Sequence, residues 1–101
     1  ALMLANNETG VIQPVQAASE IVRAAEGWLH VDAIQAAGKI PVDSRGLGAD
    51  TLSISAHKIG GPKGCGALYV REGVKVSPLC GSTISTGTRR SCVSVVMSSS
   101  V

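Results

Sequence analysis

The sequence places an amine, a carboxylate and an anion-binding pair where they could hold a reactive cofactor. Lys58 stands shortly before a glycine-rich stretch, residues 60–64, in which backbone can approach a ligand closely. A lysine amine beside small residues can form an imine with an aldehyde. Asp32 supplies the carboxylate, and Ser55 with His57 supplies a hydroxyl and an imidazole near the lysine. These side chains suit a flat cofactor that bears an aldehyde and an anionic group.

The chemistry that fits these residue types is that of pyridoxal 5'-phosphate. Its aldehyde needs an amine, its pyridine nitrogen needs a carboxylate that keeps it protonated, and its phosphate needs hydroxyl, imidazole or backbone N–H groups. An amide side chain near the ring oxygen would tune the imine. Taken in that order, the candidates are Lys58, then Asp32, then Ser55 with His57, and finally Gln35 with Asn7.

Each candidate also has a purely structural interpretation. Asn7 is a typical turn residue, and Asp32 could cap a short helix that follows it. His57 and Lys58 could be a solvated pair on the surface. His30 and Asp32 form an H-x-D pattern, but two ligands do not make a metal site, so no bound metal is expected.

The predicted elements place the candidates at the ends of strands. Residues 1–5 are a continuous apolar run, typical of a strand buried on both faces. A helix is predicted from Pro14 to Gly27, and residues 28–31 form the next strand. This strand–helix–strand order predicts a parallel sheet. The apolar face of the helix is predicted from the i, i+3, i+4, i+7 spacing of Ala18, Ile21, Val22 and Ala25.

The rest of the chain adds two strands and completes an α/β pattern. Residues 32–48 read as mostly irregular. Residues 51–55 and 67–70 are strands on either side of the glycine-rich turn, and we expect them to pair antiparallel. In open α/β sheets, ligands bind beyond the carboxyl ends of the parallel strands. The polar residues after the first three strands are therefore expected to meet at one edge of the sheet.

Length and composition exclude several classes of protein. A chain of 101 residues forms one domain at most, or a piece of one. Nine Lys and Arg against seven Asp and Glu give a net charge of +2, too small for a nucleic-acid binder held by charge. No apolar run reaches the roughly 18 residues of a membrane span. Three cysteines without a C-x-x-C pair disfavour disulfides and zinc, and favour a reducing compartment, cytoplasmic or organellar.

Long stretches of the chain resemble the cysteine desulfurases, the NifS/IscS-like group of class V aminotransferase-fold enzymes that use pyridoxal phosphate. The resemblance covers about residues 1–72. It includes the family's spacing, since Asp32 follows Asn7 by 25 residues and precedes Lys58 by 26. The matching stretches read LANNETGVIQP at 4–14, HVDAIQAAGKIPVD at 30–43, SISAHKI at 53–59 and GPKGCGALYVR at 61–71.

The resemblance implies a fold and a role for each candidate. The chain would be the central part of the large domain of a fold-type I pyridoxal-phosphate transferase, with a mostly parallel sheet flanked by helices. Residues 1–80 would be a partial cofactor-binding domain, and residues 81–101 a diverged or disordered tail. Lys58 would bind the cofactor as an internal aldimine, and Asp32 would pair with the pyridine nitrogen. Gln35 would hydrogen-bond the ring oxygen, and Asn7 would lie beside the ring. Ser55 and His57 would contact the phosphate.

The resemblance also implies an activity and partners. Family members are homodimers that take sulfur from L-cysteine, leaving L-alanine and an enzyme-bound persulfide, and pass the sulfur to an acceptor or iron–sulfur scaffold protein. Selenocysteine lyase of the same group is one alternative, and an inactive remnant serving as a binding or assembly module is another. The family's glycine run and Arg-Ser-Gly-Thr motif survive only as Arg90-Ser91, and its ring-stacking histidine and sulfur-accepting cysteine match no residue here. We therefore expect an internal segment that is inactive by itself.

Overall fold

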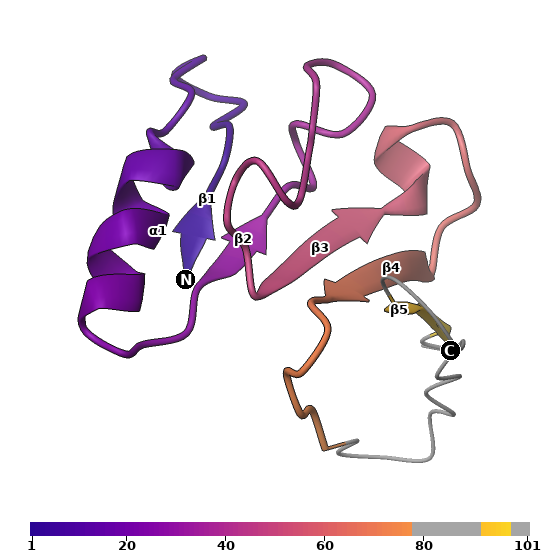
Figure 1. Cartoon of the computed structure of the whole chain (residues 1–101). Coiled ribbons are helices and arrows are strands. Elements are labelled where there is room, and N and C mark those ends of the chain that lie inside the picture. Colours follow the sequence, from indigo (N-terminus) through magenta and orange to yellow (C-terminus); the bar gives the residue numbers. More distant parts are fainter. Residues whose placement is uncertain (78–91, 98–101) are drawn as a thin grey trace.

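The computed structural model describes residues 1–77 and 92–97 of the chain. Among these residues the strands lie side by side in one sheet, with an α-helix beside it and a short 3-10 helix (Figure 1). The order across the sheet follows the chain, β1-β2-β3-β4-β5. The elements are β1 (Leu2–Met3), α1 (Val15–Ala24), β2 (His30–Asp32), β3 (Thr51–Ser55), η1 (Ala56–Lys58), β4 (Cys65–Val70) and β5 (Cys92–Met97).

The sheet is parallel on one side and antiparallel on the other. β1 pairs with β2, and β2 with β3, in parallel, whereas β3 with β4 and β4 with β5 are antiparallel. The α/β class, the strand–helix–strand unit and the antiparallel pairing of β3 with β4 are therefore confirmed. β5 forms within residues 81–101, the predicted diverged or disordered tail. The other residues of that stretch lie outside the described part of the chain, so the division after residue 80 stays a prediction.

The first strand is shorter than its apolar sequence predicts. β1 has two residues, although the Leu4 N–H still donates to the Asp32 carbonyl oxygen at 2.8 Å. The chain then turns, because the side-chain oxygen of Asn6 accepts the N–H groups of Glu8 and Thr9 at 2.9 and 3.2 Å. A side-chain turn of this kind competes with extended backbone, which ends the strand.

The buried face of α1 is only partly the predicted one. Val22 packs against the core, but Ile21 is 72% exposed and Ala25 is also exposed. The helix instead buries Val15 and Ser19. The Ser19 hydroxyl donates to the carbonyl oxygen three residues earlier at 2.7 Å, so its polar group is satisfied without water. The predicted face is therefore confirmed at Val22 and wrong at Ile21 and Ala25, because the prediction began after Val15 and left out the polar Ser19.

The core lies between α1 and one face of the sheet. Val31 of β2 is fully buried, Leu52 of β3 is nearly so, and the two are aligned across the parallel pair. Because side chains alternate along a strand, His30, Asp32 and Ser55 lie on the opposite, polar face. The buried apolar residues are Leu4, Val15, Leu29, Val31, Ala33, Ala36, Ala49 and Leu52.

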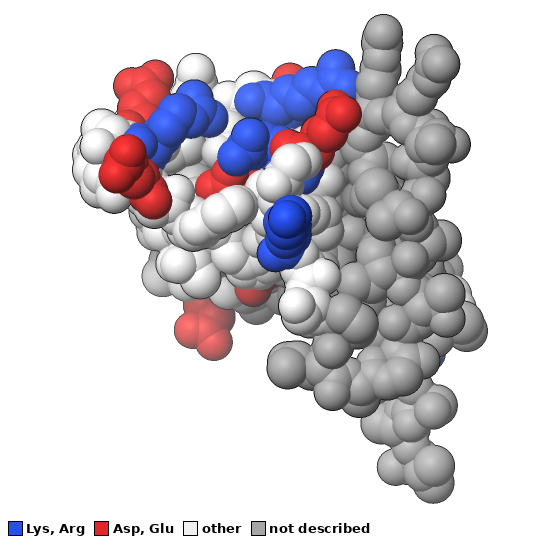
Figure 2. Space-filling view, turned by 60° about the horizontal axis from the view of Figure 1, so that its bottom comes forward, with Lys and Arg blue, Asp and Glu red and all other residues white. Residues whose placement is uncertain are grey.

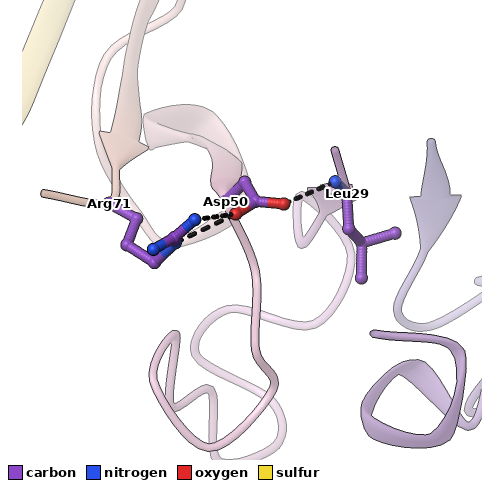
Figure 3. A network of polar contacts seen from close by, with 3 residues as sticks. All are labelled: Leu29, Asp50 and Arg71. Carbon is purple, nitrogen blue, oxygen red and sulfur yellow. Dashed lines mark hydrogen bonds and ion pairs between the residues drawn. The ribbon is translucent and has the colours of Figure 1, made fainter. Parts of the chain in front are cut away.

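A buried carboxylate ties the amino ends of β2 and β3 to the end of β4 (Figure 3). Asp50, which is 8% exposed, accepts the Leu29 N–H at 2.7 Å on one oxygen. Its other oxygen accepts Nε and Nη2 of Arg71 at 2.9 and 2.6 Å. Burial raises the pKa of this carboxyl, but the bonds from Leu29 and Arg71 and the charges of Arg71 and Arg23 lower it more. The pKa of Asp50 therefore lies below its usual 3.8.

Replacing Asp50 with alanine is expected to lower the free energy of unfolding by about 1–3 kcal/mol, because the Leu29 N–H is then buried without a partner. Asp50→Asn should cost less, since an amide oxygen can still accept that bond. The folded pKa lies below the unfolded value, so the contribution of the charge is present above roughly pH 4 and is lost as pH falls through the folded pKa.

Urea unfolding of the complete protein, at neutral pH and in acid, measures both effects. Asp43→Ala is the matched control, because Asp43 is an exposed carboxylate of the same chain. An Asp50→Ala midpoint equal to that of Asp43→Ala would show that the carboxylate does not hold the strands together.

Candidate functional site

The candidate residues follow three strands whose carboxyl ends meet at one edge of the sheet. Parallel pairing aligns Met3, the end of β1, with Asp32, the end of β2, and Asp32 with Ser53; β3 continues for two more residues to Ser55. The segments after β1, β2 and β3 lie together along the top of Figure 1. The predicted meeting of the strand ends is confirmed, while the roles of the residues stay predictions. We call this edge the site rim; its six candidates are Asn7, Asp32, Gln35, Ser55, His57 and Lys58.

Asp32 is the last residue of β2 and is half-buried. Its Oδ1 accepts the Ile34 N–H at 2.9 Å, which is the turn-forming role that a short acidic side chain often has. No hydrogen bond reaches Oδ2 from the described residues. One oxygen of the carboxylate thus shapes the loop, and the other can accept a bond from a ligand. The structural and the chemical interpretation of Asp32 are therefore compatible.

The loop after β2 holds Gln35 close to the sheet. Ala33 and Ala36, on either side of it, are fully buried. The Ala33 N–H donates to the Ser53 carbonyl oxygen at 3.0 Å, which extends the pairing of β2 with β3 into the loop. Gln35 itself is half-buried, and its Oε1 accepts Nζ of Lys39 at 3.2 Å. That bond is exposed, so Gln35 can exchange it for a ligand at little cost.

A single turn of 3-10 helix carries both the imidazole and the amine. Oγ of Ser55 lies 2.7 Å from Nδ1 of His57. In the described part of the chain this is the one direct side-chain hydrogen bond between two of the six candidates. His57 and Lys58 are exposed, and no described carboxylate lies within 4 Å of the Lys58 amine. The structure brings Ser55 and His57 into contact and leaves Lys58 open to a reactant.

The glycine-rich turn folds back on the segment that carries Lys58. The N–H of Gly61 donates to the Ala56 carbonyl oxygen at 2.7 Å. A Cβ at Gly61 would lie 2.8 Å from the Ala56 Cβ and 3.0 Å from that oxygen, so the bond requires a residue without a side chain. This close approach holds η1 in place at the end of β3.

Asn7 is exposed, and among the described residues no side-chain hydrogen bond involves it. It is placed by its neighbour Asn6, whose oxygen forms the turn after β1. The turn-forming role that the sequence suggested as an alternative for Asn7 belongs to Asn6, and the Asn7 side chain stays available at the rim.

His30 forms contacts that the sequence analysis missed. Its Nδ1 lies 2.8 Å from Oγ1 of Thr51, and its Nε2 lies 3.3 Å from Oγ of Ser53. The alternating hydroxyl residues of β3 were the available signal, because alternation puts them on one face. His30 is thus held against β3.

Within residues 1–77 and 92–97, no group of three or more His, Cys, Asp or Glu could hold a metal ion.

Two adjoining cavities, of about 280 and 180 Å³, lie at the opposite edge of the sheet. Arg23 and Arg71 line both, Arg45 lines the first and Trp28 the second. Figure 2 turns this edge forward and shows Lys and Arg next to Asp and Glu, so the visible charge is of mixed sign. The site rim is recognised by its residues and not by these cavities.

No helix in the described part of the chain is long and apolar enough to span a membrane.

The chain matches the family model described as "Aminotransferase class-V" over residues 1–99. It belongs to the class V aminotransferase family. The chain is 51% identical over 79 residues to "Cysteine desulfurase IscS" of Methanosarcina thermophila, and 51% identical over 75 residues to "Putative cysteine desulfurase NifS" of Bacillus subtilis. These matches cover 78% and 74% of this chain but 20% and 19% of the relatives. The chain therefore spans about a fifth of the length of these relatives.

Solved structures of NifS-like proteins also resemble this chain, in fold as well as in sequence. A NifS-like protein from Rickettsia africae matches with a TM-score of 0.73 and 36% identity, over 78% of this chain and 23% of that one. A structure described as SspA in complex with cysteine matches with a TM-score of 0.71 and 37% identity, over 78% of this chain and 24% of that one. The resemblance to the cysteine desulfurases and the fold expected from it are confirmed.

Ser55→Ala is expected to change the nitrogen NMR signals of the His57 ring in the complete protein without cofactor. The ring loses its partner at 2.7 Å and can then turn freely. His30 is an internal control, because Thr51 and Ser53 hold its ring instead and its signals should not change. Unchanged His57 signals would show that the bond to Ser55 is not formed in solution.

Proposed function

We propose that this chain is the cofactor-binding segment of a pyridoxal-phosphate-dependent cysteine desulfurase. One observation carries the proposal: the carboxyl end of β3, which bears a hydroxyl–imidazole pair and then an amine, lies beside the carboxyl end of β2, which bears a carboxylate. These groups match what the cofactor needs at its aldehyde, its phosphate and its ring nitrogen. The identity of about one half to proteins named cysteine desulfurase supports the same assignment.

The candidates fit the cofactor in charge and in hydrogen bonding. The exposed Lys58 amine would hold the aldehyde carbon, and Oδ2 of Asp32 would accept the N–H of the pyridine ring. Ser55 and His57 now bond to each other, and both could turn their polar atoms to a phosphate. The amide of Gln35 would donate to the ring oxygen, and Asn7 would lie beside the ring.

When bound, pyridoxal phosphate would withdraw electrons from the Cα of an amino-acid substrate. Asp32 would keep the ring nitrogen protonated, and its bond to the Ile34 N–H would hold the carboxylate in place. Ser55 and His57 would fix the phosphate, so that the ring could not rotate away from the substrate. The Lys58 amine would hold the cofactor before the reaction and move a proton at the substrate carbon during it.

The proposed substrate is L-cysteine, with L-alanine and a protein-bound persulfide as products. The structural relative SspA, described in complex with cysteine, supports an amino-acid thiol as the substrate class. A sulfur acceptor or iron–sulfur scaffold protein and a second copy of the chain are the proposed partners, in the cytoplasm or an organelle. A selenocysteine lyase would use the same rim and would differ in preferring L-selenocysteine.

Borohydride treatment of the complete protein with pyridoxal phosphate should attach the cofactor covalently to Lys58. The label should be lost in Lys58→Ala and kept in Lys63→Ala, which removes the next lysine along the chain. Mass spectrometry of the labelled peptides locates the site. Label lost only in Lys63→Ala would move the reactive amine to Lys63, and an unlabelled wild-type protein would overturn the proposed cofactor.

Asp32→Asn is expected to slow sulfide release from L-cysteine by two to three decades, about 3–4 kcal/mol of barrier, because the amide cannot stabilise a protonated ring nitrogen. Cofactor affinity should change much less. Asp43→Asn is the matched control, since Oδ1 of Asp43 accepts the Arg45 N–H at 3.0 Å in a turn like that of Asp32. Near-normal turnover in Asp32→Asn would leave Asp32 with its turn-forming role only. Running the assay with L-selenocysteine as well separates desulfurase from lyase.

A further inference from the structure

Two segments that follow neighbouring strands of the site rim approach each other closely at a glycine. Gly38 lies in the loop that follows Asp32 and carries Gln35, and Ile59 directly follows Lys58. A Cβ at Gly38 would lie 2.9 Å from Cγ2 of Ile59 and 3.7 Å from its Cβ. The first distance is well inside the roughly 3.5–4.0 Å at which carbon atoms attract each other. A side chain at position 38 would therefore push Ile59 away.

The neighbour at this contact has few ways to yield. Ile59 is 49% exposed, but its Cγ2 is bonded to the Cβ of a β-branched side chain with a restricted χ1 angle, so relief requires a less favourable rotamer or a shift of the backbone. That backbone is part of the turn that carries Lys58, because the Ile59 N–H donates to the Ala56 carbonyl oxygen at 3.0 Å. Gly38 also has a φ of +77°, which other residues rarely adopt. Position 38 thus requires glycine for its conformation and, separately, for its close approach to Ile59.

We infer that Gly38 is a positioning residue of the proposed active site. Its close approach to Ile59 sets the separation between the loop of Asp32 and Gln35 and the turn of Lys58. A cofactor held at its ring by one segment and at its aldehyde by the other needs that separation to be fixed. The inference rests on the proposed function. Gly38 would touch neither cofactor nor substrate and would act only through these two segments.

Three variants of the complete protein separate this role from backbone strain. Gly38→Ala adds both the strain of a positive φ and the contact with Ile59. Gly73→Ala adds the strain only, because Gly73 has a φ of +87° and no atom lies within 4 Å of its Cβ position. Gly38→Ala combined with Ile59→Ala keeps the strain and removes Cγ2, which leaves the two Cβ atoms in ordinary contact at 3.7 Å.

The first readout needs no cofactor. The N–H groups of Ile59 and Gly61 both donate to the Ala56 carbonyl oxygen, and their hydrogen exchange reports whether the turn after β3 is intact. Exchange should be faster in Gly38→Ala, and close to wild type in Gly73→Ala and in the double variant. A role in backbone strain only would not give this restoration.

The second readout is the amount of pyridoxal phosphate fixed to Lys58 by borohydride. We expect a loss of about tenfold or more in Gly38→Ala, because a lysine amine displaced by about 1 Å meets the aldehyde far less often in the reactive geometry. Gly73→Ala should keep the wild-type amount, and the double variant should recover most of it.

The outcomes distinguish this inference from the proposed function. A labelled wild-type protein in which Gly38→Ala behaves like Gly73→Ala overturns the inference and leaves the proposed function standing. A double variant no better than Gly38→Ala also overturns it. If the exchange rates change as expected but the wild-type protein takes no label, the contact is real, while the proposed function and the role inferred from it are wrong.

Discussion

The Asp50 carboxylate fixes the alignment on which the rest of the sheet depends. It stands just before β3, and its two oxygens hold the residue before β2 and the residue after β4. The Arg71 side chain is 49% exposed, so water screens much of its charge and the ion pair contributes little. The bond to the buried Leu29 N–H contributes more, because that donor has no water to replace a lost partner. A strand shifted by one residue would turn every side chain to the other face, so this bond at one edge of the sheet protects the geometry at the other.

The six residues at the site rim differ in how firmly the fold holds them. Asp32, Gln35 and Ser55 are half-buried and lie on or next to the strand pairing, whereas Asn7, His57 and Lys58 are exposed. This division suits the proposed chemistry. A carboxylate that recognises a ring nitrogen gains from a fixed position, while an amine that both holds a cofactor and moves a proton must be able to change its position. The 3-10 turn gives Lys58 that freedom without losing its place at the end of β3.

Much of the fold and of the site rim could be predicted from the sequence, for an identifiable reason. Apolar runs that end in polar residues gave the strand–helix–strand unit, and the known behaviour of parallel sheets placed Asp32, Ser55 and Lys58 at one edge. The helix face was predicted wrongly, because Ser19 is buried through a bond to the backbone that no apolar pattern shows. The Asp50–Arg71 pair depends on the register of β3 with β4, which aligns Thr51 with Val70; the sequence predicted the antiparallel pairing but not this register.

The contact between Gly38 and Ile59 could not have been predicted in this way. It joins two segments through the path of an irregular loop, and neither composition nor periodicity fixes such a path. The stretch from Asn7 to Lys58 nevertheless holds all six candidates, and the strand pairing and this contact link its parts to one another. A change in the length of any part would move one candidate relative to the rest. That physical constraint gives a reason for the spacing of Asn7, Asp32 and Lys58 in this chain: the length of each intervening segment has to match the strands and loops that it connects.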